Sequence, residues 1–209
     1  MARLRTIGVL AVQGAFERHA EVLRGLGHEV AHVRTAQDLS SLDGLVLPGG
    51  ESSVQIEMLE RLSMVEPLRA FVTSGAPILA TCAGAILLAS RVESPEQRSL
   101  NAIDIVVARN AWGRQVDSFE AESDADAQGR RRPLVFIRAP RILSAGPRVE
   151  VLARYRGEAV LVRSGAITCA TFHPELTSDA SLHREVFGSA VHTPKRSRSP
   201  SSSRCRGLA

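Results

Sequence analysis

Cys82 is the residue of this chain best suited to act as a nucleophile. It stands between an apolar stretch, Pro77–Thr81, and a run of small and apolar residues, Ala83–Ala89. The pattern predicts a buried strand, a sharp turn and a helix, with the Cys82 side chain facing solvent clear of the sheet. Unpaired N–H groups and the helix dipole would stabilise a thiolate there. A buried structural cysteine is the alternative, because free cysteine is often buried. Small residues suit the tight turn: Ala80, Ala83 and Gly84.

The segment Phe172–Glu175 supplies an imidazole and a carboxylate. It follows the apolar stretch Ala166–Thr171, which predicts another strand end. In an extended chain residues i and i+2 point the same way, so we expect the Glu175 carboxylate beside the His173 ring. The carboxylate would hold the imidazole in one tautomer and stabilise its protonated form. The alternative is a histidine before a proline in a surface turn, with Glu175 simply solvated.

Gly49 and Gly50 follow a third predicted strand end. Two glycines permit a close approach of backbone to ligand, so the Gly50 N–H is a candidate oxyanion donor, with the Ala83 N–H as the second. The alternatives are a plain turn or a phosphate site, although Gly49–Val54 lacks the Gly-Lys-Ser/Thr ending of a Walker loop. A thiol, an imidazole, a carboxylate and oxyanion donors are together what acyl transfer from an amide requires.

The elements around these residues predict an α/β fold. Apolar runs of strand length alternate with helical patterns in the first half of the chain, which favours a three-layer domain with a mostly parallel central sheet and helices on both faces. Loops after the strands then lie at one edge of the sheet, where ligands bind. The predicted strands are Thr6–Val12, Glu29–Val33, Gly44–Leu47 and Pro77–Thr81. The predicted helices are Phe16–Leu26, Ser52–Met64 and Pro67–Ser74.

The second half of the chain is rich in short strand-like stretches. We expect them to extend the sheet with antiparallel strands or to form a small side sheet, before a closing helix over Leu182–Val191. An acidic run, Asp117–Asp126, and a basic run, Arg130–Arg132, form either a docking site or a solvated loop. The strand-like stretches are Ala102–Val107, Val116–Ala121, Leu134–Arg138, Val149–Tyr155, Ala159–Arg163 and Ala166–Thr171.

Composition indicates one cytoplasmic domain followed by a tail. The 209 residues are 44% hydrophobic and 23% charged, and no signal peptide or membrane span is apparent. His192–Ala209 is rich in Ser and Arg and is predicted to be disordered. Without its five basic residues the net charge of +4 becomes −1 for residues 1–191, which gives no case for binding nucleic acid. Cys82, Cys169 and Cys205 are too widely spaced for a disulfide framework or a metal signature.

These segments together resemble the triad-type glutamine amidotransferases, and most closely the glutaminase subunits of pyridoxal 5′-phosphate synthases. The resemblance covers most of residues 7–191. Two departures are Ala80, where the family usually has Gly, and Trp112, where it usually has Phe. The stretches that carry the resemblance are Gly8–Phe16, Leu47–Ser52, Thr81–Gly84, Arg109–Gln115, Phe136–Pro140 and Phe172–Thr177.

The resemblance implies a flavodoxin-like class I glutamine amidotransferase domain over residues 1–191 that hydrolyses L-glutamine to L-glutamate and ammonia. Cys82 would be the nucleophile, His173 the acid and base, and Glu175 the residue that orients it. No cofactor or metal is implied. The residues implied to bind glutamine are Gly49, Gly50, Glu51, Arg109, Ile137 and Arg138, with structural ion pairing as the alternative for the two arginines.

The resemblance also implies a partner, a separate (β/α)₈ synthase subunit in a large hetero-oligomer. That subunit would receive the ammonia and build pyridoxal 5′-phosphate from a pentose phosphate and glyceraldehyde 3-phosphate. Activity would stay low until the partner docks and sets the oxyanion hole near Gly49 and Gly50. Two other hypotheses keep the fold: a Cys-dependent hydrolase of the deglycase type, and a catalytically impaired binding subunit, which Ala80 and the tail motivate.

Overall fold

The computed structural model describes residues 5–109 and 118–189. Three predictions fall outside these residues: the part of the Arg109–Gln115 motif after Arg109, including Trp112; Cys205; and the basic tail, residues 192–209. The boundary at residue 191 therefore stays a prediction.

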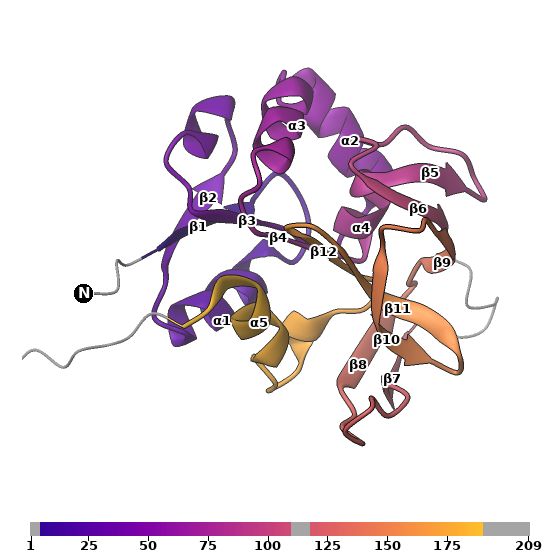
Figure 1. Ribbon diagram of the computed structural model, residues 1–209. Coiled ribbons are helices and arrows are strands. Elements are labelled where there is room, and N and C mark those ends of the chain that lie inside the picture. The colour runs from indigo at the N-terminus through magenta and orange to yellow at the C-terminus, as the bar shows by residue number, and fades with distance from the viewer. Residues whose placement is uncertain (1–4, 110–117, 190–209) are drawn as a thin grey trace, which may run out of the picture.

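A seven-stranded sheet in the order β10-β11-β12-β4-β3-β1-β2 forms the centre of the molecule (Figure 1). Its parallel strands are β1 (Thr6–Leu10), β2 (Glu29–Val33), β3 (Gly44–Leu47), β4 (Ile78–Thr81) and β12 (Ile167–Ala170). The antiparallel strands β11 (Glu158–Ser164) and β10 (Glu150–Tyr155) extend it at one edge. The predicted α/β class and mostly parallel sheet are confirmed, as is the antiparallel extension.

Helices cover both faces of this sheet (Figure 1). Helices α1 (Phe16–Gly25) and α5 (Ser181–Phe187) lie on one face, and α2 (Ser52–Arg61), α3 (Val65–Thr73) and α4 (Ala83–Leu88) lie on the other. The prediction that α5 reaches Val191 is wrong, because Gly188 ends the helix with a φ of 76°. Likewise α2 ends at Arg61 rather than Met64, because Ser63 adopts a φ of 54°.

Two small sheets complete the fold beside the main one (Figure 1). One contains β5 (Ala89–Glu93), β6 (Ile103–Ala108) and β9 (Arg141–Ala145), and the other is the hairpin of β7 (Ser118–Glu122) and β8 (Pro133–Ile137). Neither β5 nor β9 is predicted from the sequence. Both are five residues long and contain exposed polar residues, so neither has the continuous apolar run that marks the central strands.

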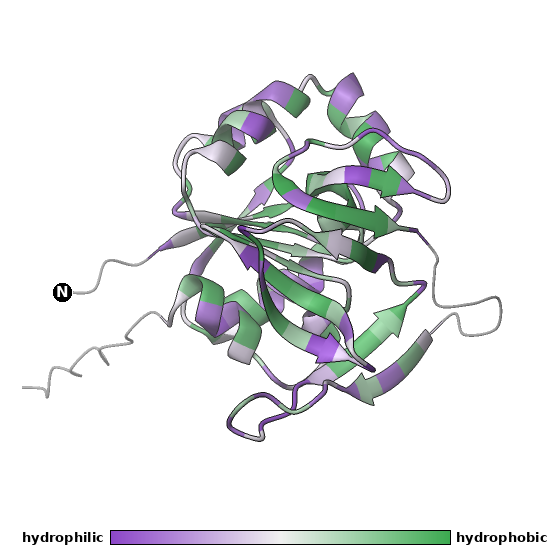
Figure 2. Ribbon diagram, turned by 45° about the vertical axis from the view of Figure 1, so that its right-hand side comes forward, coloured by the Kyte–Doolittle hydropathy of each residue, from purple (hydrophilic) through white to green (hydrophobic). Residues whose placement is uncertain are grey.

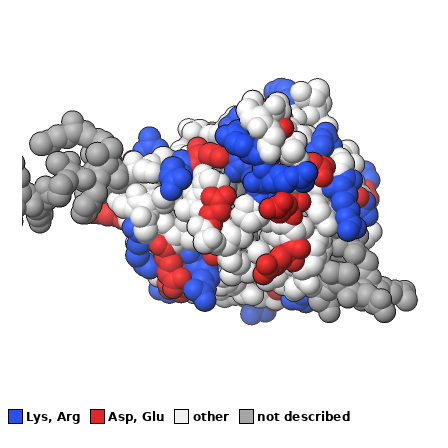
Figure 3. Space-filling view, turned by 90° about the horizontal axis from the view of Figure 1, so that it is seen from below, with Lys and Arg blue, Asp and Glu red and all other residues white. Residues whose placement is uncertain are grey.

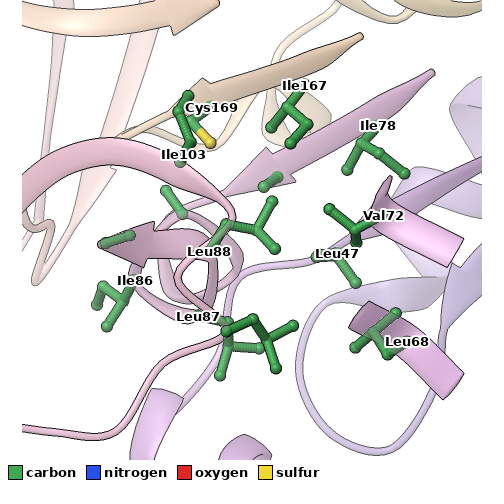
Figure 4. Packing of buried hydrophobic residues seen from close by; sticks show 14 of the residues in the cluster. Leu47, Leu68, Val72, Ile78, Ile86, Leu87, Leu88, Ile103, Ile167 and Cys169 are labelled. Carbon is green, nitrogen blue, oxygen red and sulfur yellow. The ribbon is translucent and has the colours of Figure 1, made fainter. Parts of the chain in front are cut away.

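The apolar core consists of two clusters separated by the sheet, and much of the central strands is green in Figure 2. Every residue of β3, β4 and β12 is buried, which explains why these strands read as continuous apolar runs. Figure 4 shows Leu47 and Ile78 of the sheet near Leu68 and Val72 of α3. The other cluster contains three fully buried aromatic rings, those of Phe136, Phe172 and Phe187.

The surface seen in Figure 3 carries acidic and basic side chains next to one another, as the near-neutral charge of residues 1–191 leads us to expect. Arg132, for example, pairs with Glu185 at 2.7 Å and Arg130 with Asp126 at 2.8 Å. None of the helices in residues 5–109 and 118–189 is long and apolar enough to cross a bilayer.

Gly84 allows α4 to start directly against β3. A β-carbon at this position would lie 2.1 Å from the carbonyl oxygen of Leu47, which as a backbone atom cannot rotate away. Gly84→Ala is therefore expected to lower the free energy of unfolding by about 1–3 kcal/mol, the usual cost of overpacking. Urea unfolding monitored by circular dichroism measures this.

Gly25 provides the matched control, because nothing lies within 4 Å of the β-carbon that Ala would add in helix α1. Gly25→Ala should leave stability unchanged or raise it by up to about 1 kcal/mol. Equal stability of the two variants would contradict the close packing at Gly84.

Candidate active site

Cys82 occupies a strained turn between β4 and α4. Its φ of 46° and ψ of −104° are unusual for a residue with a β-carbon, and such strain persists only where surrounding contacts hold it. Its N–H donates to the carbonyl oxygen of Ala170 at 2.8 Å, and its carbonyl oxygen accepts from the N–H groups of Ala85 (3.1 Å) and Ile86 (3.3 Å). The predicted strand, turn and helix are confirmed.

Cys82 is only 5% exposed and opens onto a cavity of about 210 Å³. The expectation of a side chain that faces bulk solvent is therefore wrong, because the loops after β1, β3 and β8 close around the turn. All six residues predicted to bind glutamine line this cavity. Its full lining is Gln13, Ala15, Gly49, Gly50, Glu51, Ser52, Cys82, Ile86, Arg109, Ile137, Arg138 and His173.

His173 and Glu175 lie beside the cavity as a buried pair, with His173 Nδ1 2.7 Å from Glu175 Oε1. The contact agrees with the expectation, but the backbone conformation of the segment does not. Pro174–Leu176 form a 3₁₀ turn (η2) instead of extended chain, because Pro174 fixes a φ suited to a first helical turn. The His173 N–H donates to the carbonyl oxygen of Val135 at 2.8 Å, which anchors the residue to β8. The solvated-turn alternative does not hold, since both residues are buried.

The charge states of this pair follow from its neighbours. Burial lowers the pKa of His173, but hydrogen bonds to Cys82 and Glu175 and attraction to their negative charges raise it to about 10. Burial raises the pKa of Glu175, yet electrostatic attraction to the His19 ring, together with the hydrogen bond and positive charge of His173, outweighs this and lowers it. At neutral pH His173 is therefore a cation between a carboxylate and the sulfur of Cys82, which is the arrangement that activates a thiol nucleophile.

The Gly49-Gly50 turn is held by two glutamines that the sequence analysis did not single out. Gln13 Oε1 accepts from the Glu51 N–H at 2.9 Å, and Gln55 Nε2 lies 3.2 Å from the carbonyl oxygens of both Gln13 and Pro48. Gln13 was detectable in principle, because it ends the first apolar strand at the same edge of the sheet. The Ala15 N–H fixes the Gly49 carbonyl at 3.1 Å.

Ala83 and Glu175 are the two predicted site residues, both within the described part of the chain, that do not line the cavity. Glu175 lies behind His173. Ala83 is the first residue of α4, so its N–H is one of those that have no acceptor within the helix. Its position next to Cys82 suits the predicted role of an oxyanion donor.

Arg109 and Glu51 form an ion pair at 2.8 Å on the cavity wall. Their side chains are 13% and 39% exposed, so the pair stands at the boundary between protein and solvent. The third predicted charge, Arg138, is exposed and adopts a φ of 42°. A guanidinium and a carboxylate side by side match the two charges of an amino acid backbone.

No cluster of three or more His, Cys, Asp or Glu side chains within residues 5–109 and 118–189 is arranged to bind a metal ion. Cys169, the other described cysteine, is fully buried in β12, and burial raises the pKa of its thiol to about 12. Of the two described cysteines, only Cys82 lines the cavity.

Residues 9–192 match the model of the SNO glutamine amidotransferase family. The pyridoxal 5′-phosphate synthase subunit PdxT of Koribacter versatilis is 50% identical over 181 residues, which cover 87% of this chain and 93% of that protein. The subunit of the same name from Shouchella clausii is 46% identical over 178 residues, covering 85% of this chain and 91% of the relative.

Solved structures agree with these sequence matches. A crystal structure of a glutamine amidotransferase superposes with a TM-score of 0.80 at 43% identity and covers 86% of this chain and 96% of its own. The PurLQS structure from Thermotoga maritima superposes with a TM-score of 0.69 at 14% identity over 88% of this chain and 98% of its own, which shows likeness of fold.

Gly49 lies directly against the His173 ring and the Cys82 side chain. A β-carbon there would lie 2.3 Å from His173 Cε1 and 3.3 Å from Cys82 Cβ. Gly49→Ala is therefore expected to displace the imidazole from Cys82 and slow alkylation of Cys82 by iodoacetamide at pH 7 by about tenfold, since 1.4 kcal/mol of lost thiolate stabilisation corresponds to that factor. Mass spectrometry of the labelled peptide measures the rate.

Gly25→Ala serves again as the control and should alkylate at the wild-type rate. Unchanged alkylation in Gly49→Ala would show that the imidazole does not activate the sulfur.

Proposed function

The chain belongs to the SNO glutamine amidotransferase family, and we propose that it is the glutaminase subunit of a pyridoxal 5′-phosphate synthase. In this role it hydrolyses L-glutamine to L-glutamate and ammonia. The observation that supports this most directly is the convergence of Cys82, His173 and Glu175 at one cavity, with 2.7 Å between the imidazole and the carboxylate. The names of relatives that are 46–50% identical over most of their length support the assignment.

The reaction proposed for this site proceeds through a thioester. The Cys82 sulfur attacks the side-chain amide carbon of glutamine, and the oxyanion forms against the N–H groups of Gly50 and Ala83. His173 gives its proton to the departing nitrogen, which leaves as ammonia. A water molecule, deprotonated by His173, then attacks the γ-glutamyl thioester and releases glutamate and the thiol. Glu175 keeps the His173 proton on Nδ1 throughout.

The charged ends of glutamine would meet the Arg109–Glu51 pair. We expect Arg109 to receive the α-carboxylate and Glu51 the α-ammonium, with Arg138 and the carbonyl of Ile137 at the same wall. The ion pair between the two residues holds their side chains in place before the substrate arrives. Because the pair is partly exposed, breaking it so that each side chain can bind the substrate instead costs little free energy.

The partner proposed for this chain is a (β/α)₈ synthase subunit that receives the ammonia, and the printed name of the relatives supports this. We expect the complex to be a hetero-oligomer in the cytoplasm, to which this chain contributes one domain over residues 1–191. The glutaminase activity of the chain should be low before the synthase subunit docks. Nucleic acid and membrane are not expected partners.

The two other hypotheses receive less support. A deglycase-type hydrolase does not require charges placed for both ends of an amino acid, which this cavity has in Arg109 and Glu51. The impaired binding subunit was motivated by Ala80, and Ala80 is fully buried in β4 beside Leu47 of β3 and Cys169 of β12, with the turn at Cys82 intact.

Cys82→Ala tests the proposal in the assembled complex with its synthase subunit. Loss of the nucleophile should lower glutamate release from glutamine by at least about a thousandfold, while complex formation stays intact. An enzyme-coupled assay for glutamate measures the rate, and size-exclusion chromatography measures assembly.

Cys169→Ala is the matched control, because it removes a buried thiol of β12 that does not line the cavity. It should keep near-wild-type glutamate release. Hydrolysis retained in Cys82→Ala would remove the proposed nucleophile, and a wild-type complex that releases no glutamate would overturn the function.

A further inference from the structure

Three buried polar residues lie behind the proposed triad and have no part in the mechanism above. They are His19 of α1, Thr81 of β4 and His183 of α5, each with no exposed surface. We call them the His19 cluster. The helices α1 and α5 cover one face of the sheet, and their histidines meet Thr81 of β4 there. The cluster lies next to Glu175 Oε2.

The His19 ring connects the cluster to the triad. Its Nε2 lies 3.3 Å from Glu175 Oε2 and 3.2 Å from Thr81 Oγ1, and its Nδ1 lies 2.9 Å from His183 Nε2. Glu175 Oε1 is taken by His173, whereas Oε2 is buried and receives no well-aligned hydrogen bond from the described residues. The His19 Nε2 is thus the contact that offsets the burial of this oxygen.

Both histidines of the cluster are neutral. Burial lowers the pKa of His19. Attraction to Glu175 opposes this decrease only in part, and the positive charge of His173 adds to it. Burial, and the neighbouring His19 ring, lower the pKa of His183 to about 3, against the attraction of Glu175 and Asp179.

The neutral His19 ring has one favourable tautomer. A bare lone pair on Nε2 would face the Glu175 carboxylate, so the proton belongs on Nε2, where Thr81 Oγ1 and Glu175 Oε2 share it, and Nδ1 must accept. His183 Nε2 then donates to His19 Nδ1, which leaves His183 Nδ1 without a proton. That atom is buried and has no partner in the described residues. Burial without a partner costs less for a lone pair than for an N–H group, which agrees with this tautomer.

We propose that His19 is a positioning residue for the reaction: its Nε2–H fixes the Glu175 carboxylate so that Oε1 faces His173, and His183 holds His19 in the required tautomer. This inference rests on the proposed glutaminase function. None of His19, Thr81 and His183 lines the cavity assigned to glutamine, so the cluster should affect kcat and leave KM unchanged.

The pH profile distinguishes a positioning role from a merely structural one. The groups that face Glu175 are His173 from the β12–η2 connection and His19 from α1. His183 faces His19 from the other side, Asp179 acts on His183, and Cys82 faces His173. Removing the His19 N–H leaves Glu175 Oε2 without its contact. The carboxylate then binds a proton more readily, and the acidic limb of the kcat profile should move to higher pH.

Three variants in the wild-type complex with synthase test the proposal. His19→Leu should lower kcat about 10- to 100-fold with KM within twofold of wild type and with the acidic limb moved upward, the range typical of an outer hydrogen-bond partner. His19→Gln retains an N–H near the Nε2 position and should recover most of kcat and the wild-type acidic limb. His28→Leu removes another buried histidine, one bonded to the Gly188 carbonyl at 2.8 Å, and should change neither quantity.

A spectroscopic measurement on the wild-type protein stands apart from activity. The ¹⁵N–¹H correlation spectrum of the histidine rings in the wild-type protein should show His19 as the Nε2–H tautomer at pH 7, assigned by its loss in His19→Gln. A His19 ring protonated on Nδ1, or wild-type kcat in His19→Leu, would overturn the inference. A wild-type complex without glutaminase activity would instead overturn the proposed function, and the tautomer would then decide the inference alone.

Discussion

The site depends on the pairing of β12 with β4. The two parallel strands are in register from Ile167 opposite Ile78 to Ala170 opposite Thr81, and the last hydrogen bond of the ladder runs from the Cys82 N–H to the Ala170 carbonyl. Both strands therefore end at one level, although 91 positions separate Cys82 from His173 in the chain. The strand pairing therefore brings Cys82 and His173 together, and the remaining contacts of the site orient these two side chains.

Sequence reasoning placed the central strands well because of how they are covered. Strands buried on both faces appear as unbroken apolar runs, and the four predicted in the first half of the chain all exist within one or two residues at each end. The same reasoning missed β5 and β9, whose polar and exposed residues resemble those of loops. Short edge pairings are decided by neighbouring chain segments rather than by their own pattern.

The residues of the proposed triad could be predicted because each stands where a strand pattern stops, whereas their support could not. His19 lies on the apolar face of α1, three residues after Phe16 and four before Leu23, and this spacing was the available signal. Nothing local shows that a histidine on such a face meets a carboxylate from a distant turn. The 3₁₀ turn at Pro174–Leu176 illustrates the same limit, since the expected contact formed through a different backbone.

In the proposed reaction His173 gives its proton to the departing amide nitrogen, and the raised pKa of His173 looks at first unsuited to this step. Part of that elevation, however, comes from the hydrogen bond and charge of Cys82, and these are lost when the sulfur bonds to the substrate carbon. The pKa of His173 must then fall, because only burial and Glu175 continue to act on it. In the proposed reaction, attack by the sulfur would therefore turn a stably protonated imidazole into an effective proton donor, and hydrolysis of the thioester would restore the initial state. A single buried carboxylate, held in a fixed position, is enough to keep the ring oriented through both steps.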